Sequence, residues 1–112
     1  MSFLFEKASA ELMLEPEELK EILQAYFEDA PQILAQGRQA ADRQDWLGLA
    51  RSMHAFKGAS FNLRLDRLGE LASRAEQGNA LPIANLFEVL QALEVELRKT
   101  ETEVADFFAQ RA

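Results

Sequence analysis

Residues 14–41 read LEPEELKEILQAYFEDAPQILAQGRQAA. Apolar residues recur in this stretch every three or four positions, which is the spacing of an amphipathic helix. Pro16 suits the first helical position, and Glu17 and Glu18 are favourable near the positive end of the helix dipole. We expect Pro31 to kink the helix without ending it. The apolar positions are Leu19, Ile22, Leu23, Tyr26, Phe27, Ala30, Ile33, Leu34, Gly37 and Ala41.

Further helices are predicted along the rest of the chain. Asp45 is a suitable N-cap for a helix over about residues 46–64, and Asp66 for a shorter one that ends at Gly78 and Asn79. A long final helix begins near Pro82, with an apolar stripe at Leu86, Leu90, Leu93, Leu97, Val104 and Phe107.

The whole pattern is that of an all-α protein. No stretch alternates polar and apolar residues for long enough to indicate a strand, and residues 2–14 fit one short helix. Four main helices with short connections favour an antiparallel up-and-down four-helix bundle, with the short N-terminal helix as an addition. The 112 residues, 48% of them hydrophobic, suffice for one core, so we expect a single domain over 1–112.

Composition excludes several classes of protein. There is no Cys, which removes disulfides, thiolate nucleophiles and the common zinc cages. No apolar stretch of about 18 residues could cross a bilayer, and the N-terminal apolar run is too short for a signal peptide, so we expect a cytoplasmic protein. The net charge of −7 disfavours nucleic-acid and anionic membrane partners. We also expect a monomer.

His54 is the only histidine and lies in the stretch RSMHAFKGASFNL, residues 51–63. At about 100° per residue, a helix here places its core face opposite His54, so the imidazole points outward. Arg51, Lys57, Arg64 and Arg67 against Asp66 make this part of the acidic chain locally positive. The core face comprises Leu49, Ser52, Met53, Phe56, Ala59, Ser60 and Leu63, and the outward face Leu47, Ala50, Arg51, His54, Gly58, Phe61 and Leu65.

Gly58 follows His54 by one turn on the same face. Glycine inside a helix costs about 0.5–1 kcal/mol relative to Ala, so its presence asks for a packing or access reason. Its missing side chain clears the approach to the imidazole, and Lys57 stands beside it as a mobile cation. Metal binding is a weak alternative because only carboxylates could join one His, and a hydrolytic triad is weaker because Ser52 and Ser60 point to the core.

HAFKGASFNL resembles the signature of histidine-containing phosphotransfer (HPt) domains of bacterial-type phosphorelays, and LEPEELKEILQAYFEDAP is similar to a second pattern of that family. The resemblance implies that His54 is phosphorylated, that Lys57 offsets phosphoryl charge and that Gly58 leaves room for a receiver domain. It implies no cofactor in this domain, because the receiver supplies the Mg²⁺. The chain departs from the family at Arg64, where Gly is common, which could alter the helix end or add a cation above Lys57.

The sequence therefore predicts a phosphorelay carrier, not an autonomous enzyme, with no kinase activity of its own. His54 would accept a phosphoryl group from the aspartyl phosphate of a receiver domain and pass it to another receiver. The expected partners are response-regulator receiver domains and a hybrid sensor histidine kinase. They would contact an apolar patch and a basic rim, formed by Leu47, Ala50, Phe61 and Leu65 and by Arg51, Lys57 and Arg64.

Two other functions stay open at this point. One is a helical interaction module that binds a receiver domain without being phosphorylated. The other is the phosphoacceptor domain of a chemotaxis-type kinase, where a separate kinase domain phosphorylates the histidine from ATP.

Overall fold

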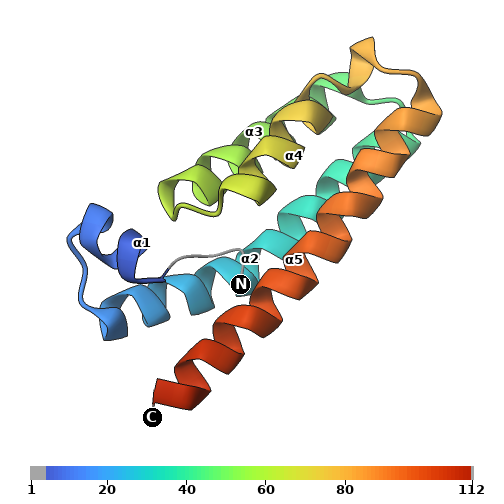
Figure 1. The fold of residues 1–112 in the computed structure, drawn as a ribbon. Coiled ribbons are helices and arrows are strands. Elements are labelled where there is room, and N and C mark those ends of the chain that lie inside the picture. The colour runs from blue at the N-terminus through green and yellow to red at the C-terminus, as the bar shows by residue number, and fades with distance from the viewer. Residues whose placement is uncertain (1–4, 112) are drawn as a thin grey trace.

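The computed structural model describes residues 5–111, and this part of the chain is helical with no strand. Figure 1 shows two long helices side by side, with a shorter helical pair packed on them. The molecule is elongated, with extents of 45 × 22 × 19 Å. The elements are α1 (Phe5–Leu12), α2 (Pro16–Asp42), α3 (Trp46–Asn62), α4 (Asp66–Glu76), the 3-10 turn η1 (Gly78–Ala80) and α5 (Ile83–Arg111).

Local chemistry explains where the helices begin. The backbone N–H of Glu15 donates to Glu18 Oε1 at 3.0 Å, which forms half of a capping box directly before Pro16. At the start of α3, the Gly48 N–H donates to Asp45 Oδ1 at 3.0 Å, so Asp45 is the N-cap that the sequence predicts. Helix α2 is continuous through Pro31.

Both boundaries of α4 differ from the sequence prediction. The N-cap of α4 is Leu65, and Asp66 is its first helical residue. Helix α4 ends at Glu76, before Gly78. The N-terminal helix is described from Phe5, so residues 2–4 of the predicted segment lie outside the described residues.

Helix α3 ends two residues earlier than predicted, at Asn62, because the backbone turns left-handed at Arg64 with φ of 62°. The Leu65 N–H donates to the Ser60 carbonyl at 2.9 Å and the Arg64 N–H to the Phe61 carbonyl at 3.0 Å. These two bonds form a Schellman motif, in which glycine is the usual residue. The left-handed backbone is therefore the physical reason why glycine would suit the position that Arg64 occupies.

We expect Arg64→Gly to relieve this backbone strain. A left-handed conformation costs an L-residue about 1–2 kcal/mol, whereas the ion pair of Arg64 with Glu11, at 3.1 Å, is half-exposed and contributes less than about 1 kcal/mol. Urea unfolding should show a gain in stability of about 1 kcal/mol in a Glu11→Gln background and a smaller gain in the unchanged chain. A loss of stability in both backgrounds would contradict this account.

The helices pack in a closed ring around one core. Helix α3 contacts α2 and α4, and α5 contacts α4 and α2. Close approach depends on small residues: a Cβ at Gly69 would lie 2.7 Å from the Phe61 ring, and one at Gly37 would lie 2.7 Å from Met53 Cε. The largest fully buried side chains of this core are Leu19, Leu23, Leu49, Met53, Phe56, Ser60, Leu68, Leu71, Leu86, Leu90 and Leu93.

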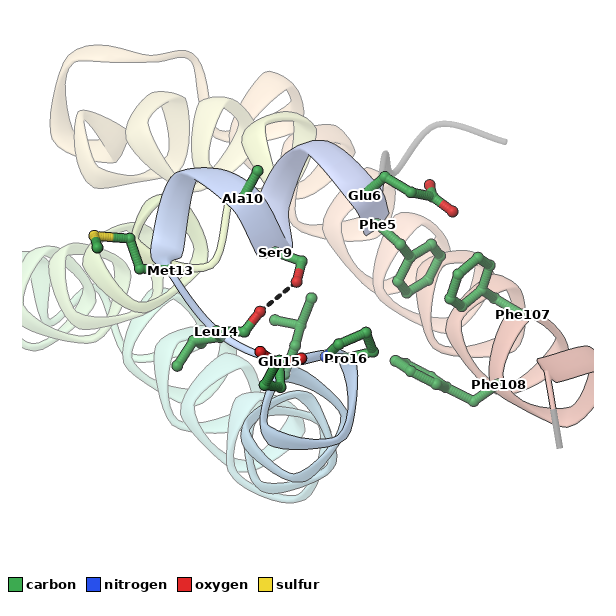
Figure 2. A pocket seen from close by; sticks show the side chains of 11 residues that line it. Phe5, Glu6, Ser9, Ala10, Met13, Leu14, Glu15, Pro16, Phe107 and Phe108 are labelled. Atoms are coloured by element: carbon green, nitrogen blue, oxygen red, sulfur yellow. Dashed lines mark hydrogen bonds between the residues drawn. The ribbon is translucent and has the colours of Figure 1, made fainter.

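Helix α1 lies at the end where α2 begins and α5 finishes, beyond the α3–α4 pair (Figure 1). Its Phe5 stacks on Phe107 of α5, with ring centroids 3.7 Å apart, and meets Phe108 edge-on at 5.4 Å. A pocket of about 540 Å³ lies beside these rings. Figure 2 shows the residues that line it, with Leu14 and the hydrogen bond from Ser9 to the Leu14 carbonyl among them. This end of the molecule is separate from the face of α3 that carries His54.

Candidate functional site

His54 projects from the middle of α3 into solvent, and 75% of its side chain is exposed. The turns on which it stands are anchored on the opposite side by Met53 and Phe56, both fully buried. The exposed ring is therefore carried on a rigid part of the helix, as the helix phase predicted.

The histidine is paired with a carboxylate of α4. His54 Nδ1 lies 3.1 Å from Glu76 Oε1. Because an ionised carboxylate can only accept hydrogen bonds, the proton of the neutral ring resides on Nδ1. The lone pair is then on Nε2, the ring nitrogen on the other side of the imidazole. This arrangement produces an oriented nitrogen nucleophile.

Glu76 also holds Lys57, whose Nζ lies 2.9 Å from Oε1 and 3.1 Å from Oε2. The Lys57 ammonium, and after it the hydrogen bond from His54, keep the pKa of Glu76 below its ordinary value of 4.5, while partial burial acts in the opposite direction. The carboxylate therefore remains ionised across neutral pH. Its contribution to stability is present above pH 4.5 and is lost as the pH falls through the lowered pKa.

Gly58 leaves the space beside the imidazole open. Apart from its chain neighbours and the backbone of its own helix turns, a Cβ placed on it would meet no described atom within 4 Å. This glycine therefore fills no packing role within the chain, in contrast to Gly37 and Gly69. This supports the interpretation that glycine stands here to keep the approach to the imidazole open.

The predicted apolar patch is only partly present on the surface. Leu47 is 61% exposed, and Arg51 is also exposed, whereas Ala50 is half-buried. Phe61 is 37% exposed, and its ring also covers Gly69, so it stabilises the packing of α3 on α4.

Leu65 does not belong to this surface. It was expected to be an outward residue of α3, but it lies beyond the end of that helix and is only 4% exposed. The early left-handed turn at Arg64 redirects the chain and places Leu65 in the core. The prediction of Leu65 as an exposed contact residue was wrong for this reason.

Arg64 itself is drawn away from Lys57. Its Nε lies 3.1 Å from Glu11 Oε2, and its Nη1 donates to the Phe61 carbonyl at 3.3 Å. The guanidinium therefore ties α1 to the end of α3. Arginine at this position was expected either to alter the end of the helix or to add a cation above Lys57. The backbone shows the altered helix end.

Ser60, predicted to face inward, is completely buried. Its hydroxyl donates to the Phe56 carbonyl at 2.7 Å and lies 2.7 Å from the Tyr26 hydroxyl, which then acts as the donor. Burial raises the pKa of Tyr26 to about 12, so its proton stays in place. The pair fixes α3 to α2 directly behind the histidine face.

Sequence reasoning missed Glu76. The signal was present, because His54 and Glu76 are each eleven residues from Leu65, the residue between the two helices. In a helical hairpin with such a short connection, positions equally far from the turn lie side by side. A carboxylate opposite the histidine could have been sought by this counting.

Residues 5–111 contain neither a metal-binding cluster nor a membrane-spanning helix. No group of three or more His, Asp and Glu side chains there is arranged to hold a metal ion. No helix in the same range has the length and apolar character needed to cross a membrane.

Comparisons with known proteins agree with the site geometry. The family model described as "Hpt domain" matches residues 21–103, which include α3, α4 and most of the two long helices. The search of curated proteins and the search of solved structures found no match.

Proposed function

This chain belongs to the Hpt domain family, which serves histidine phosphotransfer in phosphorelay signalling, and from that premise we propose that His54 is its phosphoacceptor. The donor is the aspartyl phosphate of a receiver domain, and a second receiver takes the phosphoryl group from the histidine. The observation that carries this proposal is the pairing of the exposed His54 with Glu76, which presents Nε2 to solvent as a nucleophile.

The transfer follows from the groups in place. The Nε2 lone pair forms a bond to phosphorus while the bond from phosphorus to the aspartyl oxygen breaks, which leaves the receiver's carboxylate. His54 retains the proton on Nδ1, so the phosphorylated ring is cationic and Glu76 stabilises it at 3.1 Å. Such a reaction depends on in-line positioning and charge stabilisation, and the receiver supplies the Mg²⁺.

Lys57 then has two possible partners. In the structure it is held by Glu76, but its flexible side chain, 25% exposed, lies one turn from His54. A phosphoryl group on Nε2 competes with Glu76 for the ammonium. We infer that Lys57 offsets the new charge by moving toward it without leaving the cluster.

The receiver docks over α3 and the seam between α3 and α2. An apolar groove of about 340 Å³ follows this seam and is lined by Ile22, Ile33, Ala59 and Leu63, among others. Together with Leu47 and Phe61 it provides apolar contact area, while Arg51 supplies a cation at the rim. The groove thus supplies the apolar contact area that was expected from Leu65, which is buried.

The proposed function goes with a single domain and an antiparallel arrangement of its helices. We treat residues 1–112 as one domain and the four long elements as an antiparallel up-and-down bundle, supported by the ring of contacts from α2 through α3 and α4 to α5. A monomeric cytoplasmic carrier fits this reading.

Incubation with a phosphorylated receiver tests the function. We expect label to move from the receiver to this chain, in a form that acid hydrolyses and base preserves. Binding without any transfer would support the non-phosphorylated interaction module instead. Labelling only by an ATP-fed kinase, and by no receiver, would support the phosphoacceptor domain of a chemotaxis-type kinase.

We expect Glu76→Gln to slow phosphoryl transfer about tenfold, which corresponds to about 1.4 kcal/mol of transition-state stabilisation. The amide can still accept a hydrogen bond from Nδ1, but it neither stabilises the cationic ring nor holds Lys57 by charge. Stopped-flow transfer from a phosphorylated receiver measures the rate. Glu70→Gln, on an exposed position of the same helix, is the control and should keep the original rate. Equal rates for the two variants would remove Glu76 from the mechanism.

A further inference from the structure

The charge of the chain is concentrated at one end. Residues 5–28 and 101–110 contain ten acidic and two basic side chains, whereas residues 29–100, which carry His54, contain nine of each. The acidic segments lie together where α1, the beginning of α2 and the end of α5 meet (Figure 1). The net charge of the protein therefore resides at the end of the molecule away from η1 (Figure 1).

An apolar groove of about 690 Å³ lies in this acidic end, between α2 and α5. Its floor is formed by Phe27, Val104 and Phe108, and the exposed side chains of Glu28 and Glu101 stand at its edges. The remaining lining residues are Lys20, Gln24, Ala105 and Ala109.

The groove has the length of a short helical contact. Its lining runs from Lys20 to Glu28 on α2 and from Glu101 to Ala109 on α5, and eight helical steps span about 12 Å. That length matches apolar anchors at i, i+4 and i+7 on a helix of about two turns. The small exposed residues Ala105 and Ala109 leave room for such anchors.

The groove also shows what kind of charge it accepts. Lys20 Nζ lies 5.8 Å from the centroid of the Phe108 ring, so the aromatic floor already receives a cation of the chain itself. Glu28 and Glu101 extend the same preference to both edges. A ligand with an apolar face and flanking basic side chains is complementary to this arrangement.

From these observations we propose that the groove between α2 and α5 docks a basic amphipathic helix of a partner protein. Charge disfavours the other occupants. A second copy would bring another strongly acidic end against this one, and anionic membranes and nucleic acids would be repelled by the same field.

The groove and the histidine face use different sides of α2. Gln24 and Glu28 line the groove on α5's side, whereas Ile22, Ala25 and Asp29 line the seam toward α3. At 100° per residue the centres of these two sets lie about 110° apart around the helix, on different sides of it. The proposed site is therefore independent of phosphoryl transfer, and a partner bound there would leave His54 accessible.

A labelled peptide tests the proposal directly. The probe is a fluorescein-labelled amphipathic helix of about 14 residues made of Leu and Lys, and its fluorescence anisotropy is followed as the full chain is added. The comparison peptide has the same composition in scrambled order. We expect the amphipathic peptide to bind at least tenfold more tightly, and its amide shift perturbations in NMR to centre on residues 20–28 and 101–109.

Matched variants separate the groove from general charge attraction. Glu28→Lys with Glu101→Lys should weaken binding at least tenfold, whereas Glu21→Lys with Asp106→Lys, the same charge change on the same helices outside the groove lining, should weaken it less than threefold. Ala105→Trp fills the groove without changing charge and should also weaken binding at least tenfold.

Equal weakening by the two charge pairs, equal binding of the scrambled peptide, or full binding by Ala105→Trp would each overturn the proposal. Sedimentation that shows a dimer whose formation Ala105→Trp abolishes would assign the groove to a second copy instead. Circular dichroism of each variant confirms that the helical fold is retained.

Discussion

We expect His54→Gln to abolish phosphorylation of this chain by a phosphorylated receiver. The chain contains no other histidine, so no second imidazole can take over the reaction. Glutamine lacks a nucleophilic ring nitrogen, and its amide nitrogen lone pair is delocalised and does not attack phosphorus. We expect transfer to fall below detection, measured as label that survives base and is lost in acid.

The variant is expected to remain folded, because three quarters of the His54 side chain is exposed and its only hydrogen bond within residues 5–111 is to Glu76. Thermal unfolding should therefore change little. Persistent base-stable label on the folded variant would place the phosphoacceptor elsewhere and remove the basis of the proposed mechanism.

Gly58→Gln separates docking from folding. The glycine lies in the interior of α3 with open space around it, so a side chain there gains helix propensity of about 0.5–1 kcal/mol without a clash inside the chain. The same side chain obstructs a receiver that approaches His54. We expect higher stability in urea unfolding, together with at least a tenfold loss in the second-order rate of transfer.

Gly58→Ala is the matched control for this experiment. Its single methyl group supplies helix propensity but reaches little further than the backbone, so stability should rise while the transfer rate remains within about threefold. If Gly58→Gln transferred as fast as the unchanged chain, the access argument for this glycine would fail.

Much of the fold was predictable because it rests on local signals. The apolar spacing of α2, Pro16 at its first position and the Asp45 cap of α3 each act within a few residues. The outward direction of His54 and the inward direction of Ser60 followed from helix phase alone. Such features require no knowledge of how distant segments meet.

The errors occur where tertiary structure decides. Helix phase was extended past Asn62 to Leu65, but the non-glycine left-handed residue Arg64 ended α3 first and sent Leu65 into the core. A positive φ at an arginine has no clear signal in a single sequence. The left-handed conformation is disfavoured for L-residues, and only the surrounding tertiary structure imposes it. The ion-pair partner of Arg64, Glu11, lies 53 residues away in the sequence, so this contact could not be predicted either.

Glu76 shows the same limit at the candidate site. Its role depends on the hairpin of α3 and α4 bringing it within 3.1 Å of both His54 and Lys57. The motif around the histidine supplies the nucleophile and the cation, while the orientation of the ring comes from the neighbouring helix. The site is therefore a product of packing as much as of the motif.

The most direct test of the central claim is the nitrogen to which phosphorus becomes bonded. Because there is one histidine, a chain labelled with ¹⁵N in its imidazole gives a single pair of ring signals. After reaction with a phosphorylated receiver, we predict phosphorus coupling at Nε2 of His54 and a proton retained on Nδ1, which faces Glu76. Coupling at Nδ1, or unchanged ring signals after the receiver has lost its phosphoryl group to this chain, would contradict the account.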